Sequence, residues 1–280
     1  MKKIRNFRRL SFACFVVMLL FANCDRTPDV GRTSVLAEIN SKKIVKVGYV
    51  VFPPCVFKNP NTGQLEGHFV ATIEEIAKQA DWKIEFQEAE WSTFAAGLNT
   101  RRFDVSIAPT FVTIPRAKTV SFTRPLLYAG NSAIVRANET RFTDIASLDQ
   151  ANVKIAVTQG EAGHEYARSN FKHAEIVAHP GSDQTLTMQD VVSGRADAAL
   201  GDAYVTAAFA AQHAGAVKDL FAGRPYNLTP VSWAVRSSDA ELLSFFNSCI
   251  ESLDSQGKLL AFELAAGAHW SHAKREWEVK

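Results

Sequence analysis

The chain has 280 residues, of which 47% are hydrophobic and 21% charged, an ordinary composition for a globular protein. This length suffices for one large domain or two lobes, and the composition excludes wholesale disorder. The formal net charge of +2 is concentrated at the N-terminus, because residues 1–23 hold five basic side chains and no acidic one. The rest of the chain has 26 basic and 29 acidic residues, a net charge of −3, which excludes a generally basic nucleic-acid-binding protein.

The N-terminal segment is predicted to be an export signal. Its basic residues precede the apolar run 10–22, which has the length of a signal-peptide core and is short for a membrane span. The residues Phe21-Ala22-Asn23-Cys24 resemble the cleavage box of bacterial lipoproteins, in which the cysteine becomes lipid-modified. We therefore expect a signal peptide at 1–24, lipidation at Cys24, and a periplasmic protein tethered to the inner membrane. The alternative is an anchor helix that stays uncleaved.

Polar segments flank the predicted folded region. Residues 25–40 mix Asp, Arg, Thr, Pro, Gly and Ser without periodicity, which predicts a flexible tether, and residues 271–280 form a polar tail. The folded region holds Cys55 and Cys249. An exported compartment permits a disulfide between them, but their separation in sequence leaves two buried thiols equally open.

Two successive α/β patterns follow the tether. In the first, we expect strands at 44–51, 83–87 and 104–108 and helices at 67–82 and 91–98. In the second, we expect strands at 132–135, 153–157, 176–178 and 196–200 and helices at 142–148, 162–171, 184–194 and 204–213. A strand at 231–235 and helices at 240–253 and 258–270 complete the chain. Such alternation predicts an α/β fold with mostly parallel sheets, divided into two lobes with a cleft between them.

The stretch 103–116 has the strongest functional pattern. A buried strand is expected to break at Pro109, and Thr110, Thr113 and Arg116 follow at three-residue spacing. Hydroxyls and one planar cation at the carboxyl end of a strand match the needs of a small carboxylate. The pattern therefore predicts an anion-binding position, with a surface arginine as the alternative.

Several segments, in order, resemble the periplasmic solute-binding proteins of ABC transporters, polar amino-acid class (family 3). The segments that carry the resemblance are 47–54, 104–116, 120–125, 157–160, 194–198 and Asp202. The resemblance covers 43 to about 270. It implies a type II binding-protein fold whose lobes are joined by a two-strand hinge, the first lobe formed by 41–131 plus 232–270 and the second by 132–231. It also implies a monomer that captures an amino acid or similar small molecule and delivers it to a membrane permease.

The resemblance also implies a binding site. Arg116 corresponds to the family arginine that binds the ligand carboxylate, and Asp202 to the aspartate that receives the ammonium group. A helix N-cap is the alternative role for Asp202. Backbone N–H groups of the turn at Gly160, Glu161 and Ala162 are expected to add donors. The remaining expected site residues are Thr113 and Ala108 of the signature and, as an aromatic wall, Phe52, Phe57, Trp91 and Phe111.

Phe111 and Pro109 depart from the family pattern, which has a hydroxyl residue and a small residue at these positions. A lost hydroxyl and a gained aromatic ring predict a larger, less polar or N-alkylated ligand, held in part by a cation–π contact. Weak binding is the alternative.

Two other functions stay open. The first is a dehydratase on the same fold, with Glu161, His164 and Asp183 as candidate acids and bases near the cleft. The second is a ligand-sensing module that serves a separate receptor. The histidines are scattered without paired Cys or His, and no phosphate-binding loop or nucleic-acid motif is present. We therefore expect no cofactor, no metal and no nucleic-acid partner.

Overall fold

The computed structural model describes residues 34–267. The predicted signal peptide with Cys24, the first part of the tether and the polar tail lie outside this range. Within it, no helix has both the length and the apolar character that a membrane crossing requires.

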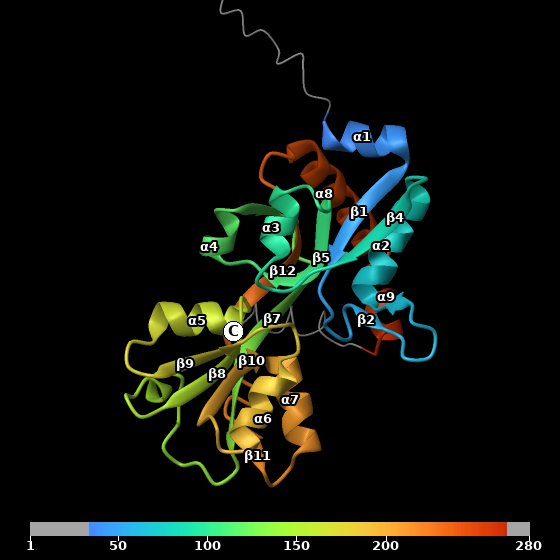
Figure 1. The fold of residues 1–280 in the computed structure, drawn as a ribbon. Helices are drawn as coiled ribbons and strands as arrows, with labels where there is room; N and C mark the ends of the chain where they lie inside the picture. Colours follow the sequence, from blue (N-terminus) through green and yellow to red (C-terminus); the bar gives the residue numbers. More distant parts are fainter. Residues whose placement is uncertain (1–33, 268–280) are drawn as a thin grey trace, which may run out of the picture. The chain divides into compact units, whose positions relative to one another are not determined.

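A ten-stranded mixed sheet forms the frame of the fold (Figure 1). Its main path runs β4-β1-β5-β12-β7-β10-β8-β9, with β6 beside β12 and β11 beside β7. The strands of this sheet are β1 (Ile44–Tyr49), β4 (Lys83–Glu88), β5 (Val105–Phe111), β6 (Val120–Phe122), β7 (Leu127–Arg136), β8 (Lys154–Thr158), β9 (Glu175–His179), β10 (Ala198–Asp202), β11 (Val217–Asp219) and β12 (Tyr226–Arg236). A separate hairpin pairs β2 (Phe57–Lys58) with β3 (Leu65–Glu66).

Helices cover both halves of the sheet (Figure 1). They are α1 (Val35–Lys42), α2 (His68–Gln79), α3 (Phe94–Asn99), α4 (Ile114–Ala117), α5 (Ala162–Asn170), α6 (Thr185–Val192), α7 (Ala203–Gln212), α8 (Ala240–Ser255) and α9 (Lys258–Ala265), with a 3-10 turn at Ala146–Leu148. The outer strand pairs are parallel, as β1 with β4 and β5 and β8 with β9 and β10. The pairs that involve β7 and β12 are antiparallel.

The buried apolar side chains divide into separate cores on either side of β7 and β12. The first lobe has one core, in which strands β1 and β5 pack against α1, α2, α3 and α8. The second lobe has a core on each face of its sheet. Alternate residues of β7 explain why: Ala133 and Val135 face the core that contains α5, whereas Ile134 faces the core of α6 and α7.

Strands β7 and β12 connect the two lobes (Figure 1). Near Leu127, β7 pairs with β12, and from Asn131 onward it pairs with β10 of the second lobe. Strand β12 pairs with β7 at Tyr226 and continues beside β5 at Val231. The fold is therefore the predicted two-lobed α/β fold with two strands between the lobes.

Three expectations about the elements differ from the structure. Strand β5 does not break at Pro109 but continues to Phe111. The pairing of β5 with β1 ends at Ser106, and its pairing with β12 shifts register between Ser232 and Ala234. Pro109, which has no N–H to donate, therefore lies where the hydrogen bonds between these strands are irregular. The helix expected at 142–148 is reduced to the 3-10 turn.

The third difference is at the end of the expected tether, where residues 35–40 belong to α1. The Ser34 side chain caps this helix, and Val35 and Ile39 are buried one turn apart in the first core. The first lobe therefore includes α1, which precedes the expected boundary at residue 41.

Candidate functional site

A nearly closed pocket lies between the lobes. The first lobe contributes side chains from two loops, from β5 and from the short helix α4: Phe52, Trp91, Pro109, Phe111 and Arg116. The second lobe contributes Glu161, Ala162 and Asp202. The pocket has a volume of about 10 Å³, hardly enough for one water molecule, so a solute enters only when the lobes move apart.

Arg116 connects the two lobes. It follows Thr113, whose hydroxyl caps the short helix α4, and its own side chain is buried. The guanidinium donates from Nη1 to the carbonyl of Phe111 (3.0 Å) and from Nη2 to the carbonyl of Gly160 (2.7 Å). Its Nε donates to Oε1 of Glu165 at 2.8 Å. In this geometry the predicted carboxylate-binding arginine already binds a carboxylate of the chain itself.

Glu165 is the residue that the sequence analysis missed. It lies in the first turn of α5, and its second oxygen, Oε2, accepts a hydrogen bond from the Thr113 hydroxyl at 3.1 Å. Both groups that were expected to serve a ligand anion therefore contact one glutamate from the other lobe. Glu165 follows Glu161, the N-cap of α5, by four residues, so both carboxyl groups stand at the start of this helix, and the sequence shows this spacing.

Asp202 has two roles at once. It ends β10 and caps α7, with Oδ1 accepting from the N–H of Tyr204 (2.9 Å), while its own N–H donates to Oε1 of Gln184 (2.9 Å). Its side chain also lines the pocket and is 2% exposed. Burial raises the pKa of Asp202 from 3.8 to about 7, against the opposing effect of the Tyr204 and Val205 N–H groups.

Glu161 is a second buried acid in the same pocket. Its Oε2 is buried and has no hydrogen-bond partner among residues 34–267. Burial raises the pKa of Glu161 well above its usual value, the nearby Asp202 raises it further, and Arg116 lowers it. A buried carboxyl oxygen without a hydrogen bond is costly, and a ligand group that donates to Oε2 would remove this cost.

The turn before α5 differs from the expectation that its N–H groups are free for a ligand. The N–H of Gly160 donates to Nδ1 of His164 (3.0 Å), and the N–H of Glu161 donates to the carbonyl of Thr158 (3.2 Å). The carbonyl of Gly160 accepts a hydrogen bond from Arg116. Its φ of +82° and its close approach to Ser92 of the other lobe both favour glycine.

The expected aromatic wall is mostly at the pocket. Phe52 and Trp91 meet edge to face with ring centroids 6.0 Å apart, and Trp91 Nε1 has no hydrogen-bond partner in the described part of the chain. Phe57 lies in β2 and is not among the lining residues, and neither is Ala108, which is buried inside β5.

The other candidate acids and bases are absent from the pocket lining. His164 accepts from the backbone of Gly160, and Asp183 binds the N–H and hydroxyl of Thr185. Both cysteines are unpaired, with Cys55 buried beside His68 (Sγ to Nε2, 3.2 Å) and Cys249 partly exposed.

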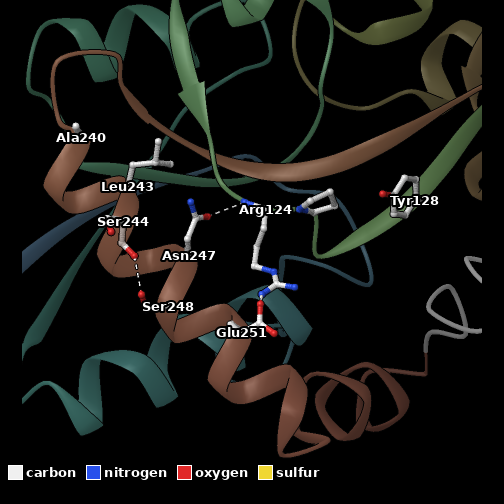
Figure 2. Close-up of a pocket in the computed structure, with 9 residues that line it drawn as sticks. Arg124, Tyr128, Ala240, Leu243, Ser244, Asn247, Ser248 and Glu251 are labelled. Atoms are coloured by element: carbon white, nitrogen blue, oxygen red, sulfur yellow. Dashed lines mark hydrogen bonds and ion pairs between the residues drawn. The ribbon is translucent and has the colours of Figure 1, made fainter.

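Figure 2 shows a larger pocket of about 750 Å³ on the first lobe, between α8 and the segment that joins β6 to β7. Arg124 lies at its centre, donates its backbone N–H to Asn247 (2.7 Å) and forms an ion pair with Glu251. This pocket is a surface groove that contains none of the cleft residues. Its charged groups are already paired, so we assign the candidate site to the smaller pocket between the lobes.

Comparison with known proteins agrees with this fold and pocket. Residues 45–263 match the bacterial extracellular solute-binding proteins, family 3. The chain belongs to this family. A Haemophilus influenzae protein named a probable amino-acid ABC transporter-binding protein is 27% identical over 214 residues, covering 74% of this chain and 78% of the relative.

Two further similarities involve an enzyme. Cyclohexadienyl dehydratase of Pseudomonas aeruginosa is 25% identical over 202 residues, 71% of this chain and 72% of the enzyme. The crystal structure of an ancestral amino acid-binding protein, described as a precursor of cyclohexadienyl dehydratase, aligns with a TM-score of 0.73 and 28% identity. That alignment covers 85% of this chain and 100% of the ancestral protein.

Proposed function

We propose that this protein is the solute-binding component of an ABC importer, which captures an amino acid or amino-acid-like molecule between its lobes and delivers it to a membrane permease. The observation that carries the proposal is that Arg116 and Asp202, from opposite lobes, line one pocket. Family membership and the amino-acid-binding relatives support it.

The pocket chemistry explains how binding is coupled to closure. Asp202 receives the amino group of the ligand, and the rings of Phe52, Trp91 and Phe111 surround its apolar part. Arg116 reaches Gly160 and Glu165 of the second lobe only when the lobes are close. A ligand that contacts both lobes favours the closed form through these differential contacts, and the closed form is what a permease recognises.

The proposal includes export, a lipid anchor at Cys24 and a monomeric protein whose first lobe includes 34–131 plus 232–270 and whose second lobe is 132–231. The signal-like N-terminus supports export. Mass spectrometry of the membrane fraction tests the anchor: a lipid-modified N-terminal cysteine is expected, and a soluble product cleaved elsewhere contradicts it. A Cys24→Ser variant that stays with the membrane also contradicts it.

A dehydratase is the second candidate, because Glu161 is a buried carboxyl with a raised pKa and an unpaired oxygen in the pocket. A neutral carboxylic acid in such a position can donate a proton to a leaving hydroxyl group. Incubating the protein with each bound solute and following loss of water by mass spectrometry decides between the two. Unchanged solute supports the binding protein, and turnover that disappears in Glu161→Gln supports the enzyme.

The direct test of the binding function is a thermal-shift screen of residues 25–280 against amino acids, their N-methylated forms and small amines. A ligand that binds the native state raises the unfolding midpoint. Asp202→Asn is the informative variant, since asparagine caps a helix as well as aspartate and removes only the charge. Loss of the shift in this variant is expected. A shift that is indifferent to Asp202→Asn contradicts the site, and no shift with any solute contradicts the function.

A further inference from the structure

The cleft contains its own substitute for a ligand carboxylate. One carboxylate oxygen of Glu165 accepts from Arg116 Nε at 2.8 Å and the other from the Thr113 hydroxyl at 3.1 Å. A free amino acid bound by this arginine and this threonine would place its carboxylate in the same position. Glu165 comes from the opposite lobe and is already there when the lobes are together.

Once Arg116 is paired with Glu165, the pocket contains more acidic than basic groups. Glu161 and Asp202 line the pocket together with Arg116, and Arg116 forms its salt bridge with a third acid, Glu165. Within residues 34–267, neither Glu161 nor Asp202 is in a salt bridge. The buried Oε2 of Glu161 also lacks any hydrogen-bond partner in this range. A cation between these two acids would supply what the pocket lacks.

The walls around the two acids suit an organic cation. Phe52, Trp91 and Phe111 are each less than a tenth exposed and line the pocket beside Glu161 and Asp202. Aromatic faces attract ammonium groups and their alkyl substituents, and they bury the carbon chain to which the nitrogen is attached. No side chain in the lining other than Arg116 is a cation, so a second ligand carboxylate would meet mainly acids and rings.

We propose that the solute is an organic amine without a carboxylate, held by Glu161 and Asp202 within the aromatic wall, while Glu165 supplies the carboxylate that binds Arg116. This inference rests on the proposed function and names the ligand class of the same pocket. The amine binds between the open lobes, and the lobes then close around it to an arrangement wider than the present pocket of about 10 Å³, with the Arg116–Glu165 pair beside the amine.

The test compares amino acids with the amines that differ from them only by the missing carboxylate. Suitable pairs are arginine and agmatine, ornithine and putrescine, lysine and cadaverine, and phenylalanine and phenethylamine. Isothermal titration of the wild-type protein is expected to show at least one amine that binds about ten-fold or more tightly than its amino acid, the size of one charged hydrogen bond.

The Glu165→Ala variant makes the assignment specific, because it frees Arg116 and Thr113 for a ligand carboxylate. We expect the preference to reverse, so that the amino acid of the same pair gains about ten-fold or more in affinity. Glu165→Gln, which keeps the shape and removes the charge, is expected to give an intermediate result. Glu175→Ala, an exposed glutamate of the same lobe, is the control and is expected to change neither affinity.

The outcomes separate this inference from the function on which it rests. Amine binding with the reversal in Glu165→Ala supports it. Amino acids that bind the wild type as tightly as their amines overturn the inference and leave the binding function in place. An unchanged preference in Glu165→Ala also overturns it. If the folded protein binds neither member of any pair, the inference and the proposed function both fail.

Discussion

At the residue scale, Asp202 is an acid whose charge is unfavourable in the folded protein without ligand. Its pKa is raised from 3.8 to about 7 by burial. A carboxyl whose pKa is higher in the folded state stabilises the fold at low pH, and this stabilisation is lost as pH rises from about 4 to about 7. The charged and polar groups that face it are Glu161, Arg116, Cys55 and Gln184.

We predict that Asp202→Asn stabilises the unliganded protein at pH 8 relative to wild type, by about 2–4 kcal/mol, and has little effect at pH 4. The variant keeps a capping oxygen for α7 and removes the charge. Urea denaturation at pH 4, 6 and 8 measures the difference. A difference between variant and wild type that does not grow with pH contradicts the assigned pKa of Asp202.

Gly160 is a residue at which the backbones of the two lobes approach each other closely. A Cβ at this position would lie 2.6 Å from the backbone nitrogen of Ser92, and the φ of +82° already disfavours other residues. We predict that Gly160→Ala holds the lobes apart and weakens solute binding about ten-fold or more.

Gly181→Ala is the matched control for this change. Gly181 also has a positive φ, +97°, but a Cβ there would have no neighbour within 4 Å. Each variant is expected to lose about 1 kcal/mol of folding free energy, because alanine disfavours a positive φ. Only in Gly160→Ala does the new Cβ also contact the other lobe. Titration calorimetry that finds equal losses of affinity in the two variants contradicts the closure contact at Gly160.

Part of the site could be predicted at the residue scale and part could not. Arg116 comes shortly after β5 and Asp202 is the last residue of β10, and their segments resemble a known family, so sequence alone indicated them. Whether the arginine is free for a ligand depends on Glu165, a residue 49 positions away in the chain. Contacts between lobes depend on the closed arrangement, which local patterns do not encode.

At the element scale, long apolar runs and helices with one apolar face were predictable, because burial on one or both faces determines their patterns. The short elements were not. β6 has three residues and α4 has four, too few for a period to be recognised. Proline at position 109 predicts the end of a strand, but the register of β12 is irregular there and β5 continues to Phe111.

Helix α1 is a further case, since its two buried residues stand in a segment that composition alone assigned to a tether. Ile39 is 3% exposed in the first core, and Asn40 accepts a hydrogen bond from the Trp82 indole (3.1 Å). We predict that Ile39→Ala lowers the free energy of unfolding by about 2–4 kcal/mol.

Lys42→Ala, in the last turn of the same helix, is the control and is expected to cost less than about 0.5 kcal/mol, because the side chain is exposed. Chemical denaturation measures both variants. If Ile39→Ala is as mild as Lys42→Ala, α1 is not part of the cooperative fold.

At the scale of the whole molecule, Arg116 joins the lobes by hydrogen bonds to Gly160 and Glu165 of the second lobe and to Phe111 of the first. We predict that Glu165→Ala shifts the unliganded protein toward open forms, since it removes one charged contact between the lobes. Small-angle X-ray scattering is expected to show a larger radius of gyration than for wild type. An unchanged radius contradicts a role for this pair in closure.

We expect a cationic solute to bind between the lobes against Asp202. Isothermal titration of wild type and Asp202→Asn with the amine and amino-acid pairs measures this binding. Saturable binding of at least one cationic solute to the wild type is expected, with a loss of about ten-fold or more in Asp202→Asn, which remains folded. Equal affinity in the two proteins, or no binding of any cationic solute to the folded wild type, would show that Asp202 does not hold a cationic solute.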